Sequence, residues 1–292
     1  MTKTALENYH ARMRRVLDHI DRHLDEDLSL SALSGVAAFS KHHFHRQFSA
    51  TFGLSAHRYV QLARMKRASY RLALRDDANV TEIALDAGYQ APDAFARAFR
   101  ECVGQAPSAF RKSPDWEPWL AALEPLDRAR STNMTYSLND VTVREFPATP
   151  VAILTHRGDP ARVYETVRRF VDWRRAAGLG RDIAATFTIF PCDPRVTPPE
   201  DFRLDLCAAT DRPIEANAQG VTAGLIPGGR CAVLRVIGSS ENLERAALVL
   251  YRDWLPASGE EPRDFPLFCQ RIAFYPDVGE HETVTDLFLP IE

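Results

Sequence analysis

The chain has 292 residues, of which 45% are hydrophobic and 26% are charged, and its formal net charge is −3 at pH 7. This length and balance are typical of a globular protein with room for two domains of ordinary size. No run approaches the ~18–20 uninterrupted apolar residues of a membrane helix, and the charged, amphipathic start is unlike a secretory signal. We therefore expect a cytoplasmic protein without a membrane partner.

Positive charge is concentrated in the first part of the chain. Residues 1–112 carry 17 Lys and Arg against 12 Asp and Glu, a balance of +5, whereas the remaining residues carry −8. Seven of the nine histidines also lie in the first part. The first region can therefore approach a polyanion that the second would repel.

The five cysteines are scattered, without the CxxC or CxxH spacing that marks a zinc site. A disulfide framework is equally unsupported, because cysteines in a cytoplasmic protein are normally reduced. We expect five reduced thiols, no metal and no cofactor.

Short helices account for most of residues 1–112. Apolar residues recur at spacings of three and four within 13–20, 30–36 and 83–87. Residues that cap helix N-termini stand just before predicted helices at Ser29, Ser40 and Ser55.

This helical region contains an internal repeat. The segments from Val36 and Asp86 match at an offset of 51, and the matched pairs are Phe44 and Phe95, Arg46 and Arg97, Phe48 and Phe99, Gly53 and Gly104, and Tyr59 and Phe110. Each unit reads as helix, tight turn, helix, and the stretch 55–74 joins the two.

Residues 113–135 hold three prolines and mixed charge, and we interpret them as a linker with one helical turn.

After the linker the apolar period changes to two, and residues 136–292 read as a β-β-α-β-β unit that occurs twice. The matched pairs are Gly158 and Gly238, Trp173 and Trp254, and Asp205 and Asp286. Such modules are expected to join their sheets around a concave surface.

The run SKHHFHRQF at 40–48 needs a chemical explanation. On a helix, Phe44 and Phe48 face the core, which leaves His42, His45 and Arg46 on other sides. Metal binding lacks a third ligand, and catalysis by histidine lacks a nucleophile or an orienting acid. A solvated surface helix is the plain alternative.

The repeat favours DNA over that alternative. Two helix-turn-helix units with a basic second helix are what two successive major grooves require. Arg46 and Arg97 can bond to guanine or clamp a phosphate, and His42 and His45 can contact base edges.

Residues 8–112 resemble the AraC/XylS family of transcription regulators, through LSLSALSGVAAFSKHHFHRQFSATFG and GYQAPDAFARAFRECVGQAPSAFRK. The resemblance implies two reading helices in adjacent major grooves, about one DNA turn apart. The residues it places at DNA are Lys41, His42, His45, Arg46, Pro92, Asp93 and Arg97. Because Pro92 and Asp93 are poor partners for DNA, we expect the first helix to do most of the base reading, and Pro92 to occupy the first helical turn.

Residues 136–292 resemble the GyrI-like (SHS2-type) small-molecule-binding domain, through FPCDPRVTPPEDFRLDLCAA, IPGGRCAVLRVIGS, YRDWLPASG and TDLFLPI. The resemblance implies an amphipathic, aromatic effector. The predicted ligand-binding residues are Trp173, Phe187, Trp254, Phe268, Cys269 and Glu282. Cys269 stands where such domains commonly carry a glutamate, which favours a neutral or weakly acidic ligand over a cation.

The predicted fold is therefore multidomain: an all-α double helix-turn-helix domain followed by an α+β domain of duplicated β-β-α-β-β modules. The predicted function is a non-enzymatic, ligand-responsive transcription regulator that binds double-stranded DNA, a small effector and RNA polymerase. Two alternatives stay open for the second domain. It could hydrolyse a reactive small molecule, with Glu280, His281 and Glu282 as candidates, or it could be a protein-binding inhibitor.

Overall fold

The computed structural model describes residues 3–75, 78–131, 136–239 and 242–292. The chain forms two compact units. The first comprises Met1–Met134 together with Tyr275–His281, and the second comprises Thr135–Phe274 and Glu282–Glu292. Among the described residues no helix is long and apolar enough to span a membrane.

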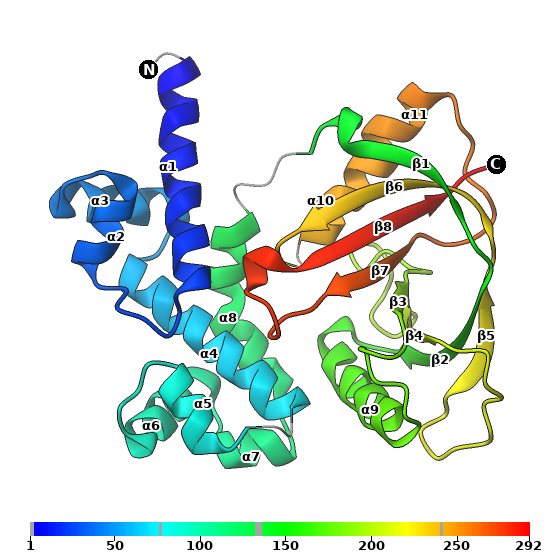
Figure 1. Cartoon of the computed structure of the whole chain (residues 1–292), viewed down its shortest axis with the longest axis horizontal. Helices are drawn as coiled ribbons and strands as arrows, with labels where there is room; N and C mark the ends of the chain where they lie inside the picture. Colours follow the sequence, from blue (N-terminus) through cyan, green and yellow to red (C-terminus); the bar gives the residue numbers. More distant parts are fainter. Residues whose placement is uncertain (1–2, 76–77, 132–135, 240–241) are drawn as a thin grey trace. The chain divides into compact units, whose positions relative to one another are not determined.

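Eight helices form the first unit, as far as it is described, and Figure 1 shows them in blue to green. They are α1 (Lys3–Arg22), α2 (Leu30–Ala37), α3 (Lys41–Phe52), α4 (Ala56–Leu74), α5 (Val80–Asp86), α6 (Pro92–Val103), α7 (Pro107–Lys112) and α8 (Trp116–Ser131). The predicted caps are confirmed, because the side chains of Ser29, Ser40 and Ser55 each accept a backbone N–H in the first turn of α2, α3 and α4. The pairs α2–α3 and α5–α6 are the two helix-turn-helix units.

The repeat read from the sequence is built into the core of the first unit. The rings of Phe44, Phe48, Tyr59, Phe95, Phe99 and Phe110 are all fully buried. Phe48 meets Tyr59 edge-on at 5.8 Å between ring centroids, and Phe99 meets Phe110 in the same way at 5.5 Å. Gly53 and Gly104 end α3 and α6 with φ of +74° and +86°, where an L-residue would be strained.

The segment interpreted as a linker is instead mostly helix, and that prediction needs correction. Within 113–131 the chain forms the 16-residue helix α8, whereas 132–135 lie outside the described residues. Trp119, Leu123 and Leu126 are buried against the rest of the unit. Burial of this apolar stripe outweighs the break in helical hydrogen bonding at Pro125.

The second unit confirms the duplicated β-β-α-β-β modules. Its elements are β1 (Val141–Phe146), β2 (Thr149–Arg157), α9 (Val163–Ala176), β3 (Thr186–Ile189), β4 (Arg203–Ala209), β5 (Thr222–Ile226), β6 (Gly229–Ile237), α10 (Asn242–Leu248), α11 (Leu255–Ser258), β7 (Phe268–Ala273) and β8 (Val284–Pro290). A π-helical turn over Val249–Trp254 joins α10 to α11.

The two modules share one antiparallel sheet with the strand order β1-β6-β8-β7-β3-β4-β2-β5. The sheet curls strongly in Figure 1. The first strand of each module crosses to the other, because β1 pairs with β6 and β5 pairs with β2. The modules meet at the centre, where β3 pairs with β7.

Side chains alternate between the two faces of this sheet. One face packs against α9 and α10, and it includes Ala152, Leu154, Ala208, Leu234, Cys269 and Leu287. The other face carries a second apolar cluster that includes Phe146, Phe187, Ile189, Val233, Phe268 and Phe288. We call the latter the aromatic face.

Candidate functional site

Helix α3 presents its polar residues to solvent because its aromatic residues are turned inward. Phe44 and Phe48, one turn apart, are fully buried, whereas Lys41, His42, His45 and Arg46 are exposed. Ser40 fixes the start of the helix by accepting the N–H of His43 at 3.4 Å. The structure therefore brings together the four DNA-binding residues predicted in the first unit.

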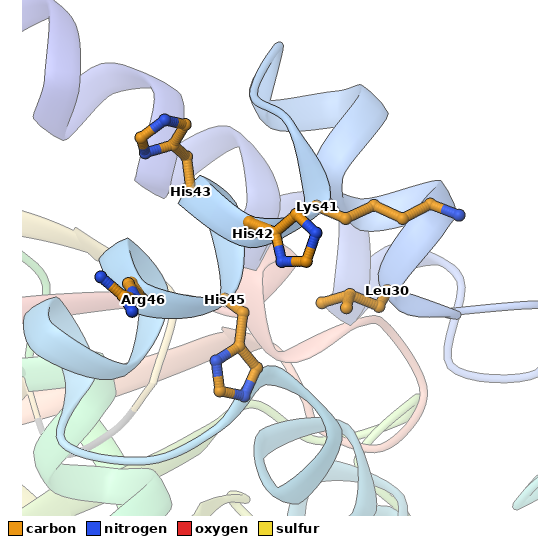
Figure 2. Close-up of a pocket in the computed structure, with 6 residues that line it drawn as sticks. All are labelled: Leu30, Lys41, His42, His43, His45 and Arg46. Atoms are coloured by element: carbon orange, nitrogen blue, oxygen red, sulfur yellow. The ribbon is translucent and has the colours of Figure 1, made fainter.

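These side chains surround a surface depression of about 510 Å³. Its lining residues are Leu30, Lys41, His42, His43, His45 and Arg46. Figure 2 shows His42 and His45 near each other and near Leu30, with His43 on another side of the helix. The lining has no carboxylate, so it is suited to an anionic partner.

Over the described residues, no group of three or more His, Cys, Asp and Glu side chains could hold a metal ion.

Helix α6, the second helix of the second helix-turn-helix unit, offers few hydrogen-bond donors at its three predicted DNA-binding positions. Pro92 occupies its first position, as predicted, and Asp93 and Arg97 are exposed beside it. Ala91 precedes the helix without a side-chain cap. Arg97 is consequently the one cation among the three predicted DNA-binding residues of this helix.

The tight turns of the two helix-turn-helix units each contain a residue with positive φ at the equivalent position. Gly88 has φ of +80° in the second unit, and Ala38, at the same place in the first, has φ of +52°. Arg64 reaches toward Gly88 from α4, and its guanidinium donates to the carbonyls of Leu24 at 2.7 Å and Glu26 at 2.9 Å. One arginine thus holds the segment that follows α1 while lying against the turn of the second helix-turn-helix unit.

The six predicted ligand-binding residues do not lie together. Phe187 and Phe268 share the aromatic face. Trp173 is on α9, in the cluster between that helix and the sheet, and Trp254 and Cys269 belong to the cluster under α10. Phe268 and Cys269 are neighbours in a strand, so their side chains point to opposite faces.

The aromatic face is closely packed around two parallel rings. Phe268 and Phe288 stack at 4.8 Å between centroids with an interplanar angle of 2°. Phe146 meets them edge-on at 4.9 and 5.2 Å.

Two buried carboxylates also stand on this side of the sheet. Asp205 is opposite Ile189, and Asp286 is opposite Arg235 across the strand pair. Arg235 donates two hydrogen bonds to Asp286 at 2.7 and 2.8 Å, and these bonds raise the pKa of its guanidinium.

Asp205 likewise accepts hydrogen bonds from side chains of its own module, the first β-β-α-β-β unit. Arg203 donates to it at 2.9 and 3.3 Å, and the hydroxyl of Thr155 donates at 2.6 Å. Thr155 and Arg235 are 80 residues apart, and Asp205 and Asp286 are 81 apart. The repeat offset matched Asp205 with Asp286 in the sequence, but nothing in the sequence pattern assigned these two acids to a site.

The three residues named for the hydrolytic alternative are placed differently. Glu280 belongs to the first unit, where it forms ion pairs with Lys66 and Arg130. His281 accepts a hydrogen bond from Arg22 at 2.9 Å in the same unit. Glu282 belongs to the second unit and is exposed. This placement lends no support to a hydrolytic site.

Comparison with known families assigns both parts of the chain. Residues 139–292, more than half of its length, match the GyrI-like small molecule binding domain. The chain belongs to the GyrI-like family. Ahead of this GyrI-like domain, residues 33–113 match a helix-turn-helix domain of AraC type.

Individual relatives of this GyrI-like protein fall into the same two groups. The probable transcriptional regulator YgiV of Escherichia coli (strain K12) is 37% identical over 161 residues, which are 55% of this chain and 99% of that protein. The HTH-type transcriptional regulator YbfP of Bacillus subtilis (strain 168) is 33% identical over 103 residues, 35% of each chain. The DNA-binding domain of AdpA, solved with a target DNA, is 27% identical with a TM-score of 0.33, and the match covers 35% of this chain and 90% of that one.

Proposed function

We propose that this protein is a transcription regulator whose helices α3 and α6 read two adjacent major grooves and whose GyrI-like domain senses a small aromatic compound. In this proposal residues 8–112 bind DNA, residues 136–292 bind the effector, and RNA polymerase is a further partner. The observation that carries it is the exposed, acid-free depression on α3, within a helix-turn-helix unit that occurs twice.

The asymmetry between the two reading helices supports unequal roles. Lys41, His42, His45 and Arg46 give α3 several donors within two turns. On α6 the predicted contacts include one cation, Arg97, beside an acid that repels phosphate. We therefore propose that α3 supplies most of the base reading and that α6 mainly fixes the register on the duplex.

For the effector we propose the aromatic face as the binding surface. Phe187, Phe268 and Phe288 supply apolar ring surfaces. Asp205 and Asp286 are each already paired with an arginine, so the charge at these two acids is balanced before any ligand arrives. This balance favours a neutral aromatic compound, because a cation would have to displace an arginine first.

The DNA proposal is tested on duplexes that the full chain selects from a random-sequence pool. Arg46→Ala should cost about 1–3 kcal/mol at one base position, with relaxed preference there. Arg97→Ala, at the matched position of the second unit, should weaken binding to all selected duplexes and lower the salt slope by about 1. An unchanged sequence preference in Arg46→Ala would show that α3 does not read bases.

The effector proposal is tested with three matched probes on the full chain: 1-naphthylmethanol, 1-naphthylmethylamine and 1-naphthoic acid. We expect the neutral probe to raise the melting temperature most, and Phe268→Leu to reduce that shift. Trp173→Phe, on the helix-covered face, is the control and should retain the shift. Stabilisation by the amine alone would contradict the neutral-ligand proposal.

A further inference from the structure

A short segment from the sheet region of the sequence packs within the first unit. Tyr275–His281 connects β7 to β8 along the chain, yet it belongs to the helical unit. The ring of Tyr275 meets Tyr70 of α4 edge-on at 5.1 Å, and Asp277 forms an ion pair with Arg75 just after α4. The helical unit is therefore completed by residues that are distant in sequence.

The centre of this packing is a group of five charged side chains, of which all but the half-buried Asp127 are buried. Glu280 accepts from Lys66 at 3.1 Å and from Arg130, so its carboxylate joins two cations. Lys66 also donates to Asp127 at 2.7 Å, and Arg130 donates to Asp21 at 2.6 Å. Glu280 is the acid that links the Lys66 pair to the Arg130 pair.

Because four of these side chains are buried, each buried charge needs an oppositely charged partner. The side chains of Lys66, Arg130, Asp21 and Glu280 are each exposed by 8% or less. Burial alone would lower the pKa of Arg130, but the Asp21 and Glu280 carboxylates more than offset it, so that pKa is raised. Removing one acid leaves a buried cation with less compensation, which favours rearrangement of the partners.

Arg130 also connects this group of charged side chains to α3, through Tyr59 and Phe48. Its Nε donates to the hydroxyl of Tyr59 at 3.0 Å. The Tyr59 ring packs edge-on against Phe48, which anchors α3 in the core. The position equivalent to Tyr59 in the second unit holds Phe110, which has no hydroxyl to accept such a bond.

We infer that Glu280 is a positioning residue for DNA reading by α3, acting through Arg130 and Tyr59. This inference rests on the proposed function, and it applies to the first helix-turn-helix unit and not to the second. The segment that carries Glu280 continues directly into β7 and β8, which supply the stacked rings of Phe268 and Phe288. An effector that separates those rings would therefore act first on the half-site read by α3.

Three variants of the full chain test the inference. Glu280→Gln removes the buried charge, and Tyr59→Phe removes the hydroxyl while keeping the ring, as in Phe110. Glu215→Gln is the matched control, because Glu215 is exposed, lies outside the first unit and belongs to neither predicted site.

Each variant is titrated against the selected duplex and against duplexes with single base changes in each half-site. The loss of preference in Arg46→Ala identifies the α3 half-site. We expect Glu280→Gln and Tyr59→Phe to lower discrimination in that half-site about fivefold or more. Discrimination in the α6 half-site, and all values for Glu215→Gln, should stay within about twofold of the native chain.

A merely structural role would produce a different pattern. Weaker binding to every duplex by one common factor, or unchanged discrimination in both half-sites, would refute the inference. If Glu280→Gln fails to fold, Tyr59→Phe decides alone, because it leaves the five charged side chains in place. Failure of the native chain to select any duplex would instead overturn the proposed function itself, and the inference with it.

Hydrogen exchange gives a second readout that needs no effector. Linkage is reciprocal, so DNA that fixes α3 should also alter the protection of amides in β7 and β8. We expect a change on adding the selected duplex to the native chain, and loss of this change in Glu280→Gln. No change in the native chain would contradict transmission through the 275–281 segment.

Discussion

Replacing Gly88 by alanine is expected to destabilise the first unit and to shift α6. Gly88 has φ of +80° in the turn between α5 and α6. An added Cβ would lie 2.7–3.0 Å from three guanidinium atoms of Arg64. The substitution therefore combines a backbone penalty with a side-chain collision.

The magnitude follows from three contributions. The left-handed conformation costs an L-residue about 1–2 kcal/mol, and the reduced freedom of the unfolded chain returns about 0.4–1 kcal/mol. Arg64 must also move, which weakens its bonds to the carbonyls of Leu24 and Glu26, and a bond from a charged donor is worth about 1.5–3 kcal/mol. Because a partial loss of one such bond suffices to clear the Cβ, we expect a total of about 2 kcal/mol.

Urea unfolding of the full chain, followed by far-UV circular dichroism, measures this loss. Arg64→Met removes the guanidinium, so the double variant isolates the backbone contribution in a mutant cycle. Ala38→Gly is the matched control at the equivalent turn, and it should be neutral or stabilise by up to about 1 kcal/mol. If Gly88→Ala is as stable as the native chain, the account of this turn is wrong.

Three further results are expected. Arg174→Met should destabilise the second unit by about 2–4 kcal/mol in urea unfolding, because the buried guanidinium donates to the carbonyls of Leu179 and Ala184 at 2.8 Å each; a loss below 1 kcal/mol would contradict this. Burial raises the pKa of the Cys231 thiol to about 11. Cys231 should therefore react with iodoacetamide at pH 8 far more slowly than half-buried Cys192, as mass spectrometry would show. The stability that the protonated Cys231 thiol contributes should be lost between about pH 9 and 11, as melting scans would show. DNA binding should weaken steeply with salt, with a log–log slope of about −0.9 per phosphate contact, and a flat titration would argue against phosphate neutralisation.

Local pattern determined much of the architecture. The offset of 51 identified Phe44 and Phe95, or Phe48 and Phe99, as equivalent core residues, and all four are fully buried. The two β-β-α-β-β modules followed from the switch of apolar period from 3.6 to 2, which depends only on neighbouring residues. Ser40 and Pro92 likewise marked helix starts because capping is a short-range effect.

The linker was misread for a reason that the tertiary structure makes clear. Prolines at 114, 118 and 125 argue against a helix when only local propensity is considered. In α8 the buried side chains of Trp119, Leu123 and Leu126 outweigh that propensity. Such burial depends on partners elsewhere in the unit, which a local pattern does not identify.

The arrangement of the candidate sites was likewise decided by the tertiary structure. Alternation along β7 predicts opposite faces for Phe268 and Cys269, but which face meets a helix depends on how α10 packs. The crossing of β1 to β6, and the packing of Tyr275–His281 in the helical unit, join residues far apart in the chain. The sequence by itself determined the periodic elements and the residues that repeat, whereas long-range pairing decided which side chains share a surface, because no local periodicity records the partner of a strand or the destination of a loop.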